Sequence, residues 1–229
     1  MPKRTKKPTV IAKKHIIIIS AVAVFLVLTG AVLAVVLRTS DDKPSVYETV
    51  ATVDGVPITV GELQLAFDAV RSEVIIYFYD TYGAKQDADF WQKSYGGEST
   101  RERMVSTAIE YAAEYKRQQL MMLEYGVITR DDMLYKNFYS EFLSENRKRA
   151  SAKESGKIIY GPVQYTQQGY YDYLHNNRLM ELYWKVNEKV LGSTEMAYDK
   201  KNFEDEFSRC YANIKVVPQK GVISQLEVQ

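Results

Sequence analysis

The sequence predicts a mostly α-helical protein with one N-terminal transmembrane helix and a helical C-terminal domain. Three observations support this fold class: a long uncharged apolar run near the N-terminus, later segments whose apolar residues recur every three or four positions, and a short β-prone segment at each end of the domain. We therefore expect a domain of about five helices, closed by a small sheet from the terminal strands.

The apolar run covers residues 16–37 and contains no charged side chain. With a rise of about 1.5 Å per residue it reaches about 33 Å, which is enough to cross a bilayer. Lysines and arginines precede the run, whereas Asp41 and Asp42 follow it. The positive-inside rule therefore predicts a single-pass protein of the cell membrane, with a cytoplasmic N-terminus and an extracytoplasmic C-terminal domain.

A cleaved signal peptide is the alternative interpretation of this run. Val32, Leu33 and Ala34 form a tolerable cleavage sequence. The run is longer than the core of a usual signal peptide, which favours a retained anchor.

The chain accordingly divides into four parts. These are a cytoplasmic basic arm (1–14), a transmembrane helix (15–37), a linker (38–48) and an extracytoplasmic domain (49–229). The linker is polar and shows no apolar periodicity, so it is expected to be a short tether.

The charge of the domain limits which partners it can bind, and its cysteine content excludes one source of stability. Beyond residue 38 the chain carries 23 basic against 29 acidic residues, so the domain is mildly acidic. It lacks the basic face that nucleic acids require, and no nucleic-acid partner is expected. Cys210 is the only cysteine, which excludes an intrachain disulfide. The sequence leaves the oligomeric state open.

The domain opens with β-prone residues at 49–53 and a tight turn at Asp54 and Gly55. Thr59 and Glu62 then have the spacing of a capping box, in which each residue's side chain accepts a hydrogen bond from the other's backbone N–H. This spacing predicts the start of the first helix.

Four further helices follow from the same kinds of pattern. They are expected from Ser99 to about Tyr125, from Thr129 into the charged segment 144–157, from Thr166 to Gly192, and from about Tyr198 to Ala212. A closing strand is expected at 213–217, where Ile214 and Val216 alternate with polar residues. Because an isolated short strand is unstable, the opening and closing strands are expected to pair.

The opening segment, Ala51 to Thr59, resembles the start of the SurA/PrsA-like extracytoplasmic chaperone family, in which V-N/D-G-x-x-I-T leads into a helix. Gly126 to Asp132 is similar to the family's helix entry G-V/I-x-I/V-T/S-D-x-E, although Arg130 and Asp132 depart from the common residues. Phe203 to Val217 is similar to the closing helix and strand of the family. The resemblance covers about residues 49–217.

The resemblance implies a chaperone that binds unfolded or exported polypeptides without ATP. The family commonly inserts a prolyl-isomerase module with a histidine cluster, whereas this chain has only His15 and His175. The chain is therefore expected to lack the isomerase module and its activity.

The residues themselves predict no enzyme, metal site or cofactor. His175 has no second histidine, cysteine or carboxylate at helical spacing, so a hydrogen-bonded or surface histidine is expected. The acidic groups at 131–132 and 204–206 fit helix first turns or a solvated face. No catalytic residue is assigned.

The chain contains 18 tyrosines, and its methionines are frequent in the same region. Tyrosine and methionine suit the binding of varied apolar peptides. Tyr111, Tyr115 and Met122 lie within two or three helical turns of one another, so they are candidate client-binding residues, although the same spacing also describes a core stripe. The alternative function is a bitopic structural or regulatory envelope protein that binds one specific partner.

Overall fold

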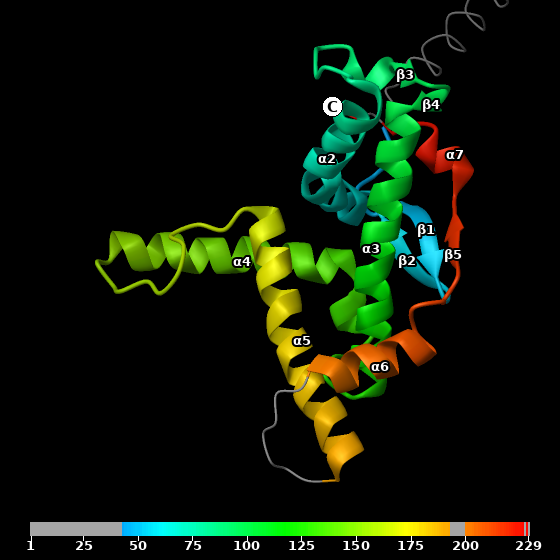
Figure 1. The fold of residues 1–229 in the computed structure, drawn as a ribbon. Helices are drawn as coiled ribbons and strands as arrows, with labels where there is room; N and C mark the ends of the chain where they lie inside the picture. Colours follow the sequence, from blue (N-terminus) through cyan, green and yellow to red (C-terminus); the bar gives the residue numbers. More distant parts are fainter. Residues whose placement is uncertain (1–42, 193–199, 227, 229) are drawn as a thin grey trace, which may run out of the picture. The chain divides into compact units, whose positions relative to one another are not determined.

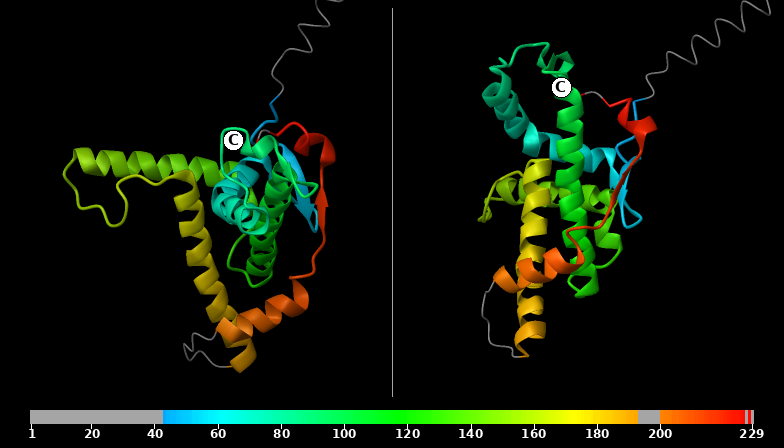
Figure 2. Two further views of the ribbon diagram at one scale, coloured as in Figure 1. Left: turned by 45° about the horizontal axis from the view of Figure 1, so that its top comes forward. Right: turned by 45° about the vertical axis from the view of Figure 1, so that its right-hand side comes forward.

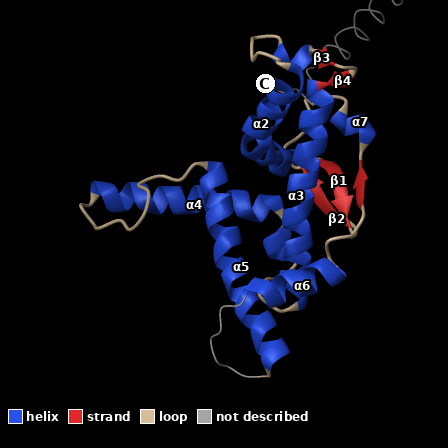
Figure 3. Ribbon diagram, in the orientation of Figure 1, coloured by secondary structure: helices blue, strands red, loops and turns tan. Residues whose placement is uncertain are grey.

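A computed structural model of the protein describes residues 43–192, 200–226 and 228. This part of the chain is mostly α-helical, with six α-helices, a three-stranded sheet in the order β2-β1-β5, and a small hairpin of β3 and β4. Figure 3 shows the sheet beside two of the long helices.

The prediction of a single-pass membrane protein needs correction. The predicted arm 1–14 and transmembrane helix 15–37, with most of the linker 38–48, lie outside the described residues. Among the residues that the structure does describe, no helix is long and apolar enough to cross a membrane. Its longest helices carry charged side chains on their exposed faces, which a bilayer would not accept. A transmembrane helix is thus no part of the fold seen here, and localisation to the cell membrane is not supported.

The sheet joins the two ends of the domain. β1 (Thr49–Val53) and β2 (Val56–Thr59) form an antiparallel hairpin. Its turn residues Asp54 and Gly55 both have positive φ, as a two-residue hairpin turn requires. β5 (Val216–Pro218) pairs with the other side of β1. The predicted pairing of the opening and closing segments is confirmed, although the closing strand lies at 216–218 and not at the predicted 213–217.

Both outer strands of this sheet contain a proline, Pro57 in β2 and Pro218 in β5. Proline has no backbone N–H, so each free edge offers fewer donors to a further strand. The sheet is therefore protected against edge-to-edge pairing.

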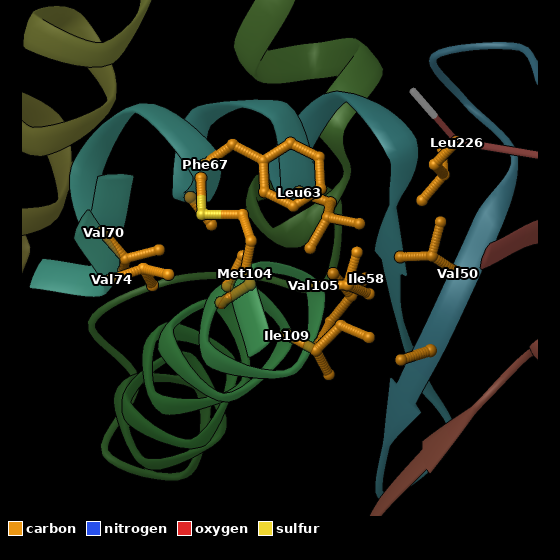
Figure 4. Close-up of a cluster of buried hydrophobic side chains, with 14 of the residues drawn as sticks. Val50, Ile58, Leu63, Phe67, Val70, Val74, Met104, Val105, Ile109 and Leu226 are labelled. Carbon is orange, nitrogen blue, oxygen red and sulfur yellow. The ribbon is translucent and has the colours of Figure 1, made fainter. Parts of the chain in front are cut away.

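Helices α2 (Val60–Tyr82) and α3 (Thr100–Glu124) pack together and against the sheet. The capping box at the start of α2 is present as predicted, because Thr59 and Glu62 each accept from the other's backbone N–H. Ser99 caps α3. Figure 4 shows the resulting core, in which side chains of α2, α3, β1 and β2 meet. Its members include Val50, Ile58, Leu63, Phe67, Val70, Val74, Met104, Val105, Ile109 and Leu226.

Between these helices the chain forms the 3₁₀ helix η1 (Phe90–Gln92) and the hairpin of β3 (Ser94–Tyr95) and β4 (Glu98–Ser99). Phe90 and Trp91 are buried in the main core.

The second half of the domain is helical. The turn at Thr129 leads into a short 3₁₀ helix, η2 (Asp131–Met133). The α-helix that was predicted to begin at Thr129 starts only after it. Leu134 is extended, and α4 (Tyr135–Glu154) begins after it. α5 (Gln167–Leu191) follows, and in Figure 1 α4 extends away from the meeting point of the long helices.

α6 (Lys200–Cys210) packs across the C-terminal half of α5 (Figure 2). The short helix α7 (Lys220–Ile223), which the sequence did not predict, follows β5.

Two arginines of α3 hold the closing segment. Arg117 donates through Nε and through Nη2 to the carbonyl of Ile214, and both donor–acceptor distances are 3.2 Å. Arg101 Nη2 donates to the carbonyls of Ile223 and Leu226, at 3.1 and 2.8 Å. Charge-assisted hydrogen bonds of this kind are stronger than neutral ones, so α3 serves as the support on which the chain returns to β1.

The pairing of β1 with β5 gives a prediction for Val217. Thr52 lies opposite Val217, and Gln219 N donates to Val50 O at 2.7 Å, so the alternating pattern places the Val217 N–H toward β1. Val217→Pro should lower the free energy of unfolding by about 1–3 kcal/mol, because it leaves a strand carbonyl unpaired. Val217→Ala keeps the N–H and should change it by less than about 1 kcal/mol. Equal effects in urea unfolding would contradict the assigned ladder.

Candidate functional site

The three predicted client-binding residues lie on α3 but in different surroundings. Met122 is fully buried, in the cluster that α3 forms with α5 and α6. Tyr115 is half-buried; its ring stacks on that of His175 with centroids 4.0 Å apart, and its hydroxyl donates to Asp172 at 3.0 Å. Tyr111 lines an open groove, with its hydroxyl 3.2 Å from that of Tyr115. Their role in client binding stays a prediction, and Tyr111 is the member that the solvent reaches through a groove.

A buried polar network ties α3 to its neighbours. Lys116 Nζ lies 2.6 Å from Glu62 Oε1, and the two side chains are only 1% and 4% exposed. Lys116 Nζ also donates to the Met133 carbonyl at 3.0 Å. The Tyr171 hydroxyl lies 3.5 Å from Glu62 Oε1, and burial raises the pKa of Tyr171 well above its ordinary value. The network connects α2, α3, η2 and α5.

His175 belongs to the same interior. Its Nε2 is 2.6 Å from Gln118 Oε1, and its side chain is buried. Burial lowers the pKa of His175 to about 3, and the nearby cations Arg178 and Lys116 act in the same direction. His175 is therefore a neutral, hydrogen-bonded core residue. Within the described residues, no group of three histidine, cysteine or carboxylate side chains could hold a metal ion.

Two open grooves flank the exposed face of α3. The groove toward β5 and α7 has a volume of about 390 Å³ and an apolar lining from Val105, Ile109, Val216, Pro218 and Ile223. The groove toward α2 has a volume of about 540 Å³ and includes Val70, Glu73, Tyr111 and Glu114. Ser106 and Glu110 line both grooves, so only this ridge of α3 separates them.

A line of large apolar side chains is left exposed along α5. Tyr173, Met180, Trp184 and Leu191 are each 46% to 49% exposed. Their spacing of seven, four and seven residues places them on one face of the helix. The opposite face carries the buried residues Leu182 and Val186, which pack toward α3 and α6. We call these four residues the α5 stripe.

The loop between α4 and α5 also presents apolar side chains. Ile158 and Tyr160 are 81% and 83% exposed. Asn146 exchanges two hydrogen bonds with the backbone of Tyr165, at 3.1 and 2.9 Å. Arg149 donates to the carbonyls of Tyr160 and Pro162, at 3.0 and 2.7 Å. The exposed side chains are thus carried by a loop that α4 holds in a defined shape.

The sequence interpretation did not identify the α5 stripe. Val190 follows Leu182 and Val186 at four-residue steps, yet it is 54% exposed whereas they are buried. The second, seven-residue spacing was visible in the sequence, but nothing there shows which face is covered.

The buried His175 gives a prediction about acid stability. Since its pKa is about 3 in the folded protein and about 6.5 in the unfolded chain, the unfolded state binds the proton first as the pH falls. Stability should fall by up to about 1.4 kcal/mol per pH unit between about pH 6.5 and pH 3. Between pH 6.5 and 5 most carboxylates stay ionised, so His175→Gln should remove most of that decline in urea unfolding. An equally steep decline in the variant would contradict this interpretation.

Comparisons with known proteins give one distant relative. No protein-family model and no solved structure matches the chain. The chain is 26% identical over 112 residues to a protein of Bifidobacterium longum subsp. longum described as "Chaperone for lacto-N-biosidase". The match covers 49% of this chain and 39% of the relative, so the chain spans about two fifths of the length of the curated protein that it matches. The comparisons do not support the SurA/PrsA resemblance; they show a partial, distant similarity to a chaperone.

Proposed function

We propose that this protein is a chaperone that binds a client polypeptide through the α5 stripe, without ATP. The observation that carries the proposal is the line of Tyr173, Met180, Trp184 and Leu191, exposed on a helix whose opposite face is already buried. A helix with one apolar face buried in its own domain has no structural need for a second one. An exposed line of aromatic and methionine side chains is typical of surfaces that bind other proteins.

The stripe suits reversible binding. Covering a large apolar side chain completely is worth about 1.5–3 kcal/mol, and these side chains are already about half covered within the folded domain. Each would contribute about 1 kcal/mol, before the cost of ordering the client. Methionine and tryptophan at Met180 and Trp184 offer an adaptable side chain next to a rigid one, which tolerates different apolar partners.

A chaperone dedicated to a single partner protein is a second candidate. The relative's description names one client, lacto-N-biosidase, and this favours a chaperone with one partner over one with many. The two candidates use the same surface but differ in selectivity. Recovery of activity of one co-expressed enzyme, with no effect on unrelated denatured enzymes, would identify the dedicated chaperone.

The test of the proposed surface is a double variant, Met180→Ala with Trp184→Ala. It should abolish most of the suppression of aggregation when a chemically denatured model enzyme is diluted into buffer, as measured by light scattering. Because both side chains are half-exposed, the free energy of unfolding should change by less than about 1 kcal/mol.

A matched control exists on α2, where Ile76 and Tyr79 are 57% and 63% exposed. Ile76→Ala with Tyr79→Ala removes a similar amount of exposed apolar surface, and suppression of aggregation should persist. If both double variants lose suppression equally, the effect is general hydrophobicity and the assignment to α5 is wrong. If the unaltered protein gives no suppression at several-fold excess and recovers no co-expressed enzyme, the chaperone proposal is wrong.

A further inference from the structure

The grooves beside α3 form a second apolar surface, separate from the α5 stripe. The floor of the groove toward β5 comes from Val105 and Ile109 of α3, which are 5% and 9% exposed. Val216, Pro218 and Ile223 of the closing segment form its other wall. This groove is open to solvent, so an apolar side chain from outside can enter it.

The groove has fixed walls. Arg101 lines the groove, but its Nη2 is engaged with the carbonyls of Ile223 and Leu226. Arg117 holds the chain just before β5 through the Ile214 carbonyl. The closing segment is therefore held on α3 at both ends of the groove.

The rims of the two grooves are acidic. Their lining includes the four carboxylates of Glu73, Glu102, Glu110 and Glu114. Glu110 and Glu114 share Arg117 as an ionic partner, at 2.5 and 3.6 Å. In the part of the chain that the structure describes, neither Glu73 nor Glu102 forms an ion pair.

The cations of the rim are already engaged. Arg103 pairs with Glu98 at 3.2 Å and lies over the Tyr77 ring, 4.1 Å from its centroid. Arg101 donates to backbone carbonyls and keeps its positive charge, but the carboxylates at the rim still outnumber the arginines. A ligand that approaches α3 therefore meets an apolar floor with carboxylates on both sides.

We propose that these grooves bind an extended segment of the client in which apolar residues are flanked by lysine or arginine. An apolar side chain enters the groove between Val105, Ile109 and Val216, while basic side chains reach Glu102 on one side and Glu73 on the other. Tyr111 forms part of the second groove and offers a ring face to a basic or apolar side chain. The inference rests on the proposed binding of clients but uses a surface other than α5.

The test uses labelled short peptides and the full-length protein. One peptide carries leucines flanked by lysines, and a second carries the same leucines flanked by glutamates. Fluorescence anisotropy should give a dissociation constant about tenfold lower for the lysine peptide, because two surface ion pairs together contribute about that factor. The preference should shrink as salt is added, since exposed charges are screened.

Three variants locate the binding. Glu73→Gln with Glu102→Gln should remove most of the preference for lysine. Glu154→Gln with Asp205→Asn, on exposed positions of α4 and α6, removes equal charge outside the grooves and should keep it. Ser106→Trp, on the exposed ridge that lines both grooves, should weaken binding of the lysine peptide about tenfold or more by filling them.

The outcomes separate this inference from the proposed function. If both peptides bind equally, or if Ser106→Trp binds the lysine peptide as well as the unaltered protein does, the inference is wrong. If neither peptide binds while suppression of aggregation persists and depends on Trp184, the inference fails and the proposed function stands. If suppression is absent from the unaltered protein but the lysine peptide binds the grooves, the proposed function fails and the peptide site stands.

Discussion

The buried ion pair of Lys116 and Glu62 is the point at which the long elements of the domain meet. Glu62 caps the start of α2 with one carboxylate oxygen and meets Lys116 of α3 with the other. Lys116 also holds the Met133 carbonyl in η2, and Tyr171 of α5 approaches Glu62 from a third direction. A charge buried to this degree is stable only if its partners stay in place, and removing one partner of such a pair costs about 3–5 kcal/mol.

α4 also begins close to the N-terminus of α2. Gly61, next to Glu62, lies directly against the ring of Tyr135, the first residue of α4. A Cβ at Gly61 would overlap that ring, so only glycine permits this approach. With α4 and η2 held here, α5 is fixed by its inner face through Tyr171 and His175, and the α5 stripe is left on its outer face. The candidate client surface thus lies on the outer face of α5 because the polar groups of the inner face have their partners inside the domain.

Local patterns in the sequence were enough to predict the starts of several elements. The spacing of Thr59 and Glu62 identified the start of α2, and the alternation at Ile214 and Val216 pointed to a closing strand, which begins at Val216 and pairs with β1. Each of these depends on residues close together in the chain. The second role of Glu62 could not be predicted, because its partner Lys116 is 54 positions away and lysine on a helix is usually exposed.

The sequence could not show which side chains the fold covers. Met122 and Tyr111 belong to one helical pattern, yet α5 and α6 cover the first and leave the second beside a groove. The apolar run 16–37 led to the prediction of a membrane anchor; it lies outside the described residues, and none of the described helices is long and apolar enough to cross a membrane. The α5 stripe illustrates the same point for an exposed face. Apolar spacing identifies a helix face, but it does not show whether the fold covers that face.

Photo-crosslinking can show whether the outer face of α5 contacts the client. A benzoylphenylalanine in place of Trp184 should crosslink to a denatured model enzyme or to a co-expressed client, while the same probe in place of the more exposed Tyr79 on α2 should not. Crosslinks from position 79 with none from position 184 would show that the client does not bind the outer face of α5.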